Sequence, residues 1–501
     1  MRGEYPMHAS SAPVTPTYTL VVVCVALFVI PLTITGSGVL VLPISQEFGA
    51  SYLQAQWVIC SFMVSYAAFM AMTGVIADAL GRKLSFVVGL LLFAVASALA
   101  ACASSLLVLI VARAVTGLGA AAVTTAGTAI LASVYSGPAR VKAFTIFGTS
   151  LGLGLAVGPL VAGGTVTFLE SWRPFFGVIA AILGVISALG FRLPESRSQE
   201  RHSVDWIGGV LFTACLIVFV SAFSMAPAAG WTDPQVLSLL AIGVALVPLF
   251  VKVETRAQHP ILNMQLFSNR QFLAVCITPV FLGFGYISLL FYLPQYLAVV
   301  AHMSAIEVGI ALMFSTLPSL LFPLFFSLIG RQLPLKTLMV LTFLFLVIGP
   351  LSLAWVIDCP TLLTLALPLF ITGGSFGVSL AYLDGAAVSV VSPHRSGMAA
   401  GMFNTFRLGG EALAIPALGM VVIALLSLQA VDRQRGLSVL TQGDLERAAT
   451  LLALPKESLV SYLAIAMQGT LIVVSIVSLV GLLIILKLSA QRITEGVEYA
   501  R

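Results

Sequence analysis

The stretch that decides the fold reads Gly-Val-Ile-Ala-Asp-Ala-Leu-Gly-Arg-Lys and occupies positions 74–83, between two long apolar segments. It places one acid, Asp78, and two bases, Arg82 and Lys83, in a chain of which only 9% of the residues are charged. Charged side chains at a membrane boundary are costly unless they have a partner or a function. The stretch is therefore typical of a short connection between two membrane-spanning helices.

The composition of the whole chain excludes a soluble fold. Of its 501 residues, 59% are hydrophobic and the mean hydropathy is +1.09, whereas a soluble domain is about 45–50% apolar and about 25% charged. A spanning helix needs roughly 20 apolar residues. We predict an all-α polytopic membrane protein with fourteen transmembrane helices, near positions 18–42, 55–76, 85–103, 106–134, 143–166, 174–191, 205–224, 235–251, 271–297, 305–329, 335–357, 361–383, 397–427 and 459–487.

The distribution of Lys and Arg predicts the orientation. With the N-terminus inside, the inner segments hold seventeen of these residues and the outer segments hold five. Because positively charged loops stay in the cytoplasm, we predict a multi-pass protein of the cell (inner) membrane with both termini cytoplasmic. The loop 428–458 then lies outside, where Asp444 as a cap and Pro455 as a stop predict a short helix within 443–453.

Several classes of protein are excluded. The chain has no Gly-x-x-x-x-Gly-Lys-Ser/Thr segment and no nucleophile–base or metal-ligand cluster, and its six cysteines are scattered without a C-x-x-C pair. We therefore predict no enzymatic activity, no cofactor, no metal site and no nucleic-acid partner. Energy for any transport must come from an ion gradient or from the gradient of the substrate itself.

Four segments resemble the major facilitator superfamily, and in particular its drug:proton antiporters with fourteen spans. The stretch 74–83 is similar to the first cytoplasmic loop of that family. The segment 113–121 resembles its Arg-x-x-Gln-Gly-x-Gly pattern, with Thr116 in place of Gln. The segment 154–164 resembles the exporter-specific motif of helix 5, and 401–410 resembles the matching segment of the second half.

The resemblance implies a major facilitator fold in a 6 + 2 + 6 arrangement, with a substrate cavity between two six-helix halves. The boundaries that we expect are a cytoplasmic tail 1–17, a first bundle 18–191, a linker with two extra helices 192–270, a second bundle 271–487 and a cytoplasmic tail 488–501. One departure concerns helix 1, where the family usually has an acid. The aligned stretch 33–43 has Ile34 at that position.

Four charged side chains within apolar segments are candidates for transport or coupling. Arg113 lies about two turns into its segment and either controls charge in a cavity or forms a structural hydrogen-bond hub. Glu411 follows Arg407 by one helical turn, so the two share a face. This leaves open a proton-carrying carboxylate, which would compensate for the missing helix 1 acid, and a permanently ionised structural pair. Asp384, near Arg395, is explained at least as well by exposure at the inner interface.

Two glycine-containing motifs have predicted roles in conformational change. In the loop with Gly74, Asp78, Gly81, Arg82 and Lys83, we expect Asp78 to latch the inner side closed; the alternative is topological anchoring by the two bases alone. The helix motif with Gly154, Gly158, Pro159 and Gly163 permits close helix approach and a bend. By resemblance it indicates an exporter, although general helix packing also uses glycine.

The side chains that we expect to line a substrate cavity are Thr116, Tyr286, Tyr292, Gln295 and Asn404. For Tyr292 and the neighbouring Tyr296, an aromatic belt at the membrane interface is the favoured interpretation.

We predict a secondary active transporter that exports small organic molecules, either drugs or an endogenous metabolite such as a siderophore, by proton antiport with alternating access. The alternatives are an importer of a small nutrient and a transport-inactive membrane sensor of the same fold. The expected partners are the small-molecule substrate, protons and membrane lipid. An accessory or outer-membrane export partner is left open.

Overall fold

The computed structural model describes residues 15–196, 205–257, 260, 264–329, 333–358, 360–391, 396–428, 437, 440 and 445–490. Every predicted apolar segment is helical, and the described residues contain no strand, which confirms the all-α fold class. The helices of the first part of the chain are α1 (Pro16–Phe48), α2 (Tyr52–Leu80), α3 (Arg82–Ala101), α4 (Leu106–Val134), α5 (Gly137–Leu169), α6 (Arg173–Gly190), α7 (Trp206–Ala229) and α8 (Pro234–Glu254). Those of the second part are η1 (Met264–Ser268), α9 (Arg270–Leu282), η2 (Gly283–Ile287), α10 (Leu289–Val300), α11 (Ala305–Ile329), α12 (Leu335–Val356), α13 (Leu362–Ser389), α14 (Ser396–Ser427), α16 (Leu445–Leu452) and α17 (Lys456–Ala490).

Thirteen helical spans, counted over the described residues, are long and apolar enough to cross a membrane, and α9, η2 and α10 together form one of them. The helix α2 is not among the thirteen, although it has 29 residues and covers the predicted segment 55–76. The count of fourteen and the cytoplasmic position of the termini therefore stay predictions.

Short polar side chains set where several helices begin. Ser51 caps α2 in a capping box with Gln54, and Thr361 caps α13 in the same way with Thr364. Asp233 accepts hydrogen bonds from two backbone amides at the start of α8. Such caps satisfy amide groups that the helix itself leaves unpaired. The loops between the long apolar segments can therefore remain short.

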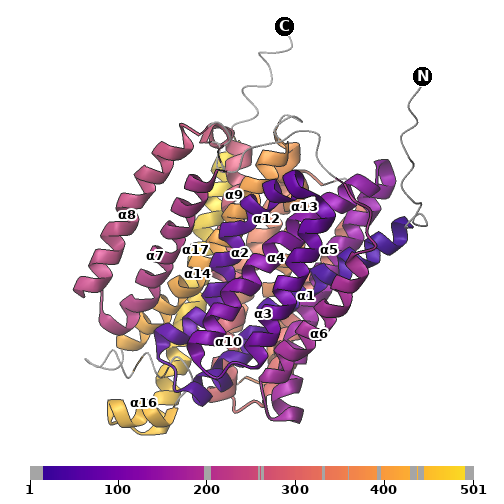
Figure 1. The fold of residues 1–501 in the computed structure, drawn as a ribbon. Coiled ribbons are helices and arrows are strands. Elements are labelled where there is room, and N and C mark those ends of the chain that lie inside the picture. The colour runs from indigo at the N-terminus through magenta and orange to yellow at the C-terminus, as the bar shows by residue number, and fades with distance from the viewer. Residues whose placement is uncertain are drawn as a thin grey trace, which may run out of the picture.

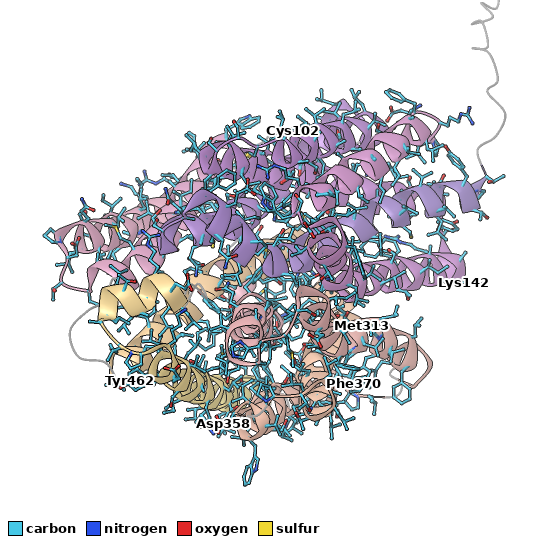
Figure 2. All side chains as sticks on the ribbon, turned by 90° about the horizontal axis from the view of Figure 1, so that it is seen from below. Cys102, Lys142, Met313, Asp358, Phe370 and Tyr462 are labelled. Atoms are coloured by element: carbon cyan, nitrogen blue, oxygen red, sulfur yellow. The ribbon has the colours of Figure 1, made fainter. Side chains whose placement is uncertain are left out.

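The helices form two groups that lie side by side. We name α1–α6 the first half and α9–α14 with α17 the second half, because the members of each pack mainly on one another. The view in Figure 2 has Cys102 on the first half and Tyr462 and Asp358 on the second. The pair α7 and α8 lies at one side of the molecule, with α7 against α2 and α14 and with α8 outermost (Figure 1).

The end of the molecule that carries α16 is the end that the charge distribution predicts to be outside, and we name it the outer end (Figure 1). The helix α16 confirms the short helix predicted in the loop 428–458, whereas its expected cap, Asp444, lies outside the described residues. Glu446 of α16 accepts a hydrogen bond from Lys456 Nζ at 2.8 Å, and this neighbour lowers the pKa of the Glu446 carboxyl.

Two long helix contacts join the halves, α5 with α11 and α2 with α14. Nearer the outer end, α1 also meets α10. A Cβ atom at Gly38 of α1 would lie 2.6 Å from the carbonyl oxygen of Leu290 on α10, so only glycine fits there. The halves are therefore in direct contact at the outer end in this conformation.

Candidate transport site

A cluster of polar side chains lies where the two halves face each other. Arg407 of α14 forms an ion pair with Asp384 of α13, with 3.4 Å between Nη1 and Oδ1. Glu411, one turn after Arg407, is 6% exposed and interacts electrostatically with it. Tyr66 of α2 belongs to the other half but is close enough to interact with all three charges, and its hydroxyl lies 2.9 Å from Thr124 Oγ1 of α4.

The two carboxylates of this cluster differ in their contact with solvent. The Asp384 side chain is 55% exposed, whereas Glu411 is buried. Burial penalises an ionised carboxylate, and a nearby guanidinium favours it. Protonation of Glu411 therefore depends on how closely Arg407 approaches, which depends in turn on the attachment of Arg407 to Asp384.

The contact between Asp384 and Arg407 was not predicted from the sequence. The sequence places Asp384 near Arg395, which lies outside the described residues, and this position is explained at least as well by an exposed carboxylate at the inner interface as by a coupling role. The exposure of the Asp384 side chain is confirmed, and the structure adds its ion pair with Arg407. The two residues are 23 positions apart on different helices, so no spacing rule within one helix reveals the contact.

Arg113 of α4 has a different environment. It is 1% exposed, its Nε donates to the carbonyl oxygen of Val58 at 3.3 Å, and its Nη1 has no hydrogen-bond partner among the described residues. The guanidinium lies 4.6 Å from the ring of Phe62 and 5.7 Å from that of Phe176. These contacts hold α2, α4 and α6 together inside the first half, which favours the structural alternative, while a coupling role stays a prediction.

The predicted cytoplasmic gating loop forms a sharp turn between α2 and α3. Gly81 has a φ of +117°, which favours glycine, and a Cβ atom there would lie 2.7 Å from Glu195 Oε1. The backbone amide of Arg82 donates to the carbonyl oxygen of Ser196 at 3.1 Å, and its Nη1 donates to that of Ala129 at 3.5 Å. The segment that follows α6 thus lies across the loop.

Three further residues belong to this loop. Lys83 is half-buried, and a Cβ atom at Gly74 would make ordinary contact with Thr125 of α4. The backbone of Asp78 is helical, but its side chain lies outside what the structure describes. The latch that we expected of Asp78 therefore stays a prediction.

The glycine motif of α5 allows close packing against two different helices, α1 and α11. A Cβ atom at Gly154 would overlap the carbonyl oxygen of Phe28, and one at Gly158 would lie 2.6 Å from that of Leu32. Both contacts are with α1, in the same half. The hydroxyl of Thr35 strengthens this contact by donating to the carbonyl oxygen of Leu155 at 3.1 Å.

The other face of α5 meets α11 of the second half. A Cβ atom at Gly163 would overlap the Ala305 carbonyl oxygen, and the carbonyl oxygen of Pro159 lies 2.7 Å from the Cβ position of Gly309. Gly152, which the motif did not include, packs on the backbone of Ser319 in the same way, and the Ser319 hydroxyl donates to its carbonyl oxygen at 3.3 Å.

The five candidate cavity residues do not form one group. Thr116 donates to the carbonyl oxygen of Arg113 at 2.6 Å within α4, and the Tyr286 hydroxyl donates to that of Ser315 at 3.1 Å within the second half. Asn404 is half-buried on α14, in the turn before Arg407. These three residues are thus distributed over both halves.

Tyr292 and Gln295 of α10 are buried together near the outer end, at 5% and 8% exposure. Tyr296 is 1% exposed and donates to the carbonyl oxygen of Ile357 at 2.8 Å. The interpretation of Tyr292 and Tyr296 as an interfacial aromatic belt is therefore wrong, because both rings lie inside the protein. Position near the end of an apolar segment does not distinguish a lipid-facing tyrosine from a buried one.

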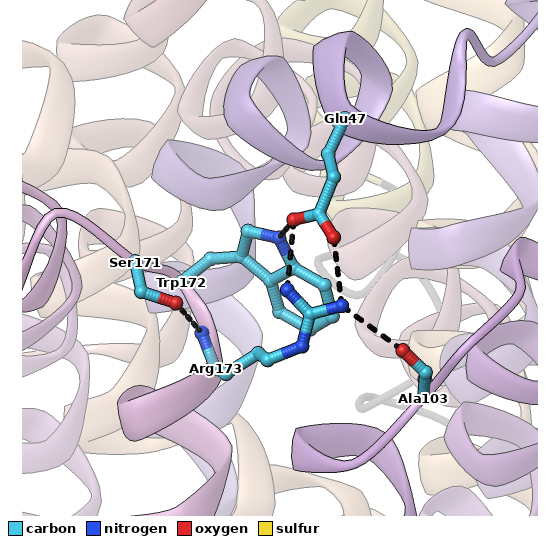
Figure 3. Close-up of polar contacts among 5 residues, drawn as sticks. All are labelled: Glu47, Ala103, Ser171, Trp172 and Arg173. Atoms are coloured by element: carbon cyan, nitrogen blue, oxygen red, sulfur yellow. Dashed lines mark hydrogen bonds and ion pairs between the residues drawn. The ribbon is translucent and has the colours of Figure 1, made fainter.

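A polar contact that was not predicted from the sequence connects three segments of the first half (Figure 3). Glu47, at the outer end of α1, lies 2.7 Å from Arg173 Nη2 and accepts a hydrogen bond from Trp172 Nε1 at 2.6 Å. Arg173 Nη2 also donates to the carbonyl oxygen of Ala103 at 3.1 Å. From the sequence, Arg173 is known only as one of the five Lys and Arg residues in the predicted outer segments.

Comparison with known proteins agrees with this architecture. The family model of the Major Facilitator Superfamily matches residues 23–415 of this chain. The puromycin resistance protein pur8 of Streptomyces alboniger is 32% identical over 417 residues, which cover 80% of this chain and 81% of that protein. The multidrug resistance protein Stp of Mycobacterium tuberculosis (strain CDC 1551 / Oshkosh) is 27% identical over 416 residues, which cover 82% of this chain and 77% of that protein.

Among solved structures, a bacterial homolog of the human lysosomal transporter Spinster, in an inward-facing and unoccupied conformation, aligns with a TM-score of 0.66 at 14% identity. The alignment covers 95% of this chain and 97% of that one. The family match, the sequence relatives and the helical architecture agree: the chain is a multi-pass membrane transporter that belongs to the Major Facilitator Superfamily.

Proposed function

We propose that the protein exports small organic molecules by proton antiport, with Glu411 as the residue that carries the proton. The observation that supports this most directly is the position of Glu411, buried beside Arg407 and close enough to Tyr66 of the opposite half to interact with it electrostatically. Ionisable residues inside a membrane bundle are costly and mark proton and substrate pathways.

The cluster offers a simple coupling scheme. With Glu411 ionised, Arg407 is shared between two carboxylates; with Glu411 protonated, Arg407 interacts with Asp384 alone. Because Tyr66 and Thr124 belong to the first half and the charged residues to the second, separation of the halves changes the surroundings of Glu411. Proton release on one side and uptake on the other would then follow the alternation of the cavity.

The direction and the substrate class are supported by similarity. Two relatives are named for resistance to puromycin and to multiple drugs, and the α5 motif resembles that of exporters. A second candidate is a neutral or anionic metabolite such as a siderophore, because helix 1 has Ile34 where the family usually has an acid, and Arg407 can bind an anion.

The test is transport in proteoliposomes with and without an imposed pH gradient, comparing the wild type with Glu411→Gln. We expect Glu411→Gln to abolish pH-dependent transport while the protein remains folded in the membrane. Glu446→Gln, an exposed carboxylate on α16, is the matched control and should behave as wild type. Unchanged transport by Glu411→Gln would remove this residue from the mechanism, and a wild type without any transport would favour a sensor.

A further inference from the structure

A chain of three polar groups joins the two halves near the outer end. Gln56 of α2 donates from Nε2 to the hydroxyl oxygen of Tyr292 on α10. The Tyr292 hydroxyl in turn donates to the carbonyl oxygen of Ile415 on α14 at 3.1 Å. Gln56 is 6% exposed, so the chain is buried along with Tyr292. We name Gln56, Tyr292 and Ile415 the outer lock.

Two small cavities flank this lock. The inner one is lined by all three lock residues and Gln295, and the outer one by Tyr292, Gln295 and Leu440 of the predicted external loop, among others. Each has room for about one water molecule, whereas pockets for drug-sized ligands measure about 300–1,000 Å³. The cavities therefore suit water and not an organic substrate, and only the side chains of Tyr292 and Gln295 line both.

The inner cavity ends close to Glu411. Ile415 follows Glu411 by one turn of α14, a distance of about 6 Å along the helix axis. The irregular segment η2, which precedes Tyr292 in the same span, packs directly on this turn: a Cβ atom at Gly283 would lie 3.1 Å from Glu411 Cα. Such π-helical turns are often found at functional sites.

We propose that the outer lock is a proton gate, an inference that rests on the proposed role of Glu411 as the proton carrier. While the lock is closed, the Tyr292 hydroxyl is engaged on both sides and separates the two cavities. When the outer ends of the halves part, Gln56 leaves Tyr292 and water connects the external loop with Glu411. Protons then pass along this water to the carboxylate.

In coupled transport, a closed gate would prevent the leakage of protons. If outside protons reached Glu411 while the substrate cavity faced inwards, the gradient would be dissipated without export. Because the lock closes only when α2 and α10 are together, it ties proton entry to the outward-open conformation. Polar side chains and water inside a membrane bundle are the usual components of such a pathway.

The charged and titratable groups around Glu411 are few. Arg407 lies on its own helix, Tyr66 of α2 interacts with it electrostatically, and Asp384 of α13 is linked to it through Arg407. The segments of α7, α9 and α17 that cross the membrane centre contain no Asp, Glu, His, Lys or Arg, and their cysteine thiols are those of Cys215 and Cys276. The segment η2 contributes only Tyr286, whose hydroxyl donates to the carbonyl oxygen of Ser315. Among these described groups, the buried carboxylate that an entering proton can bind is that of Glu411.

The test measures proton flux without substrate in proteoliposomes that enclose a pH-sensitive dye, after a pH gradient is imposed. Gln56→Leu removes the hydrogen bond between Gln56 and Tyr292. Tyr292→Phe removes both hydrogen bonds of the Tyr292 hydroxyl, of which only the one from Gln56 joins the two halves. We expect each to raise the substrate-independent flux about twofold to tenfold, which is the shift in an open–closed equilibrium expected from one lost hydrogen bond. Adding Glu411→Gln to Tyr292→Phe should remove the extra flux.

Tyr382→Phe is the matched control, since Tyr382 is also buried but its hydroxyl faces Thr342 at 3.3 Å within the second half. It should leave the flux unchanged. Wild-type transport that ignores the pH gradient would overturn the proposed function and the gate with it. Transport that follows the gradient, together with both lock variants at wild-type flux, would overturn the gate alone, as would extra flux that survives Glu411→Gln.

Discussion

Arg113 and Arg407 are both guanidinium groups inside membrane-spanning helices, but their surroundings differ. Arg113 is enclosed within the first half by the rings of Phe62 and Phe176. Arg407 lies at the boundary between the halves, where its side chain is 19% exposed and paired with Asp384. Both arginines have direct contacts within their own half, but Arg407 also interacts electrostatically with Tyr66 of the opposite half.

This difference shows that burial alone does not identify a coupling residue. Aromatic faces and a backbone carbonyl stabilise the charge of Arg113 without any group that can exchange a proton. Arg407 has carboxylates as neighbours, so its charge is linked to a protonation equilibrium. What distinguishes the two sites is the presence of titratable partners across a helix boundary.

Among the variants that test this comparison of arginine sites, Arg407→Met is expected to have the largest effect. Removing one partner from a buried charge cluster costs about 3–5 kcal/mol, and the exposure of Asp384 reduces this penalty through solvent screening. We expect pH-driven transport in proteoliposomes to fall at least about tenfold. Arg407→Lys keeps the charge and should retain part of the activity. Wild-type transport by Arg407→Met would contradict the assignment of the site.

A smaller effect is expected from Arg113→Met. Replacing a buried charge by an apolar side chain of similar volume is often neutral or stabilising. We therefore expect transport within about threefold of wild type and an unchanged or higher melting temperature, measured on the same purified protein. If a well-folded Arg113→Met variant instead loses transport, the coupling role that the sequence indicated would be supported and the comparison reversed.

Arg173 is an arginine in a third kind of environment. Removing the charge of its partner, Glu47, is expected to have the smallest effect. Its ion pair with Glu47 is partly exposed, and such pairs contribute about 0–1 kcal/mol. Glu47→Gln should lower the stability by no more than this and leave transport unchanged. The loss should shrink further in about 1 M salt, where charges are screened over about 3 Å. A large loss of transport would show that this contact takes part in the cycle.

Much of the fold follows from the sequence alone. All fourteen apolar segments are helical, because uninterrupted runs of this length have no other low-energy conformation in a bilayer. The helix in the predicted external loop was also predictable, since Leu445–Leu452 lies between Asp444 and Pro455. These features depend on residues that are close together in the chain.

The contacts between distant helices were not predictable in the same way. The pairing of Glu411 with Arg407 lies within one helix and could be anticipated, whereas Asp384 joins them only through tertiary packing. Likewise, Gln56 and Tyr292 are 236 residues apart, and nothing in the sequence around either one points to the other. A single sequence contains no spacing rule that relates such pairs.

The two-sided packing of α5 has a consequence for the rate of the transport cycle. At Gly152 and Gly163 the backbones of α5 and α11 meet with no side chain from α5 between them, so at these two positions no α5 rotamer has to change when the halves shift. We therefore expect the two glycines themselves to add little to the activation barrier. The slow step of conformational exchange should therefore lie in breaking the polar contacts across the halves, such as those of Ser319 and Tyr292.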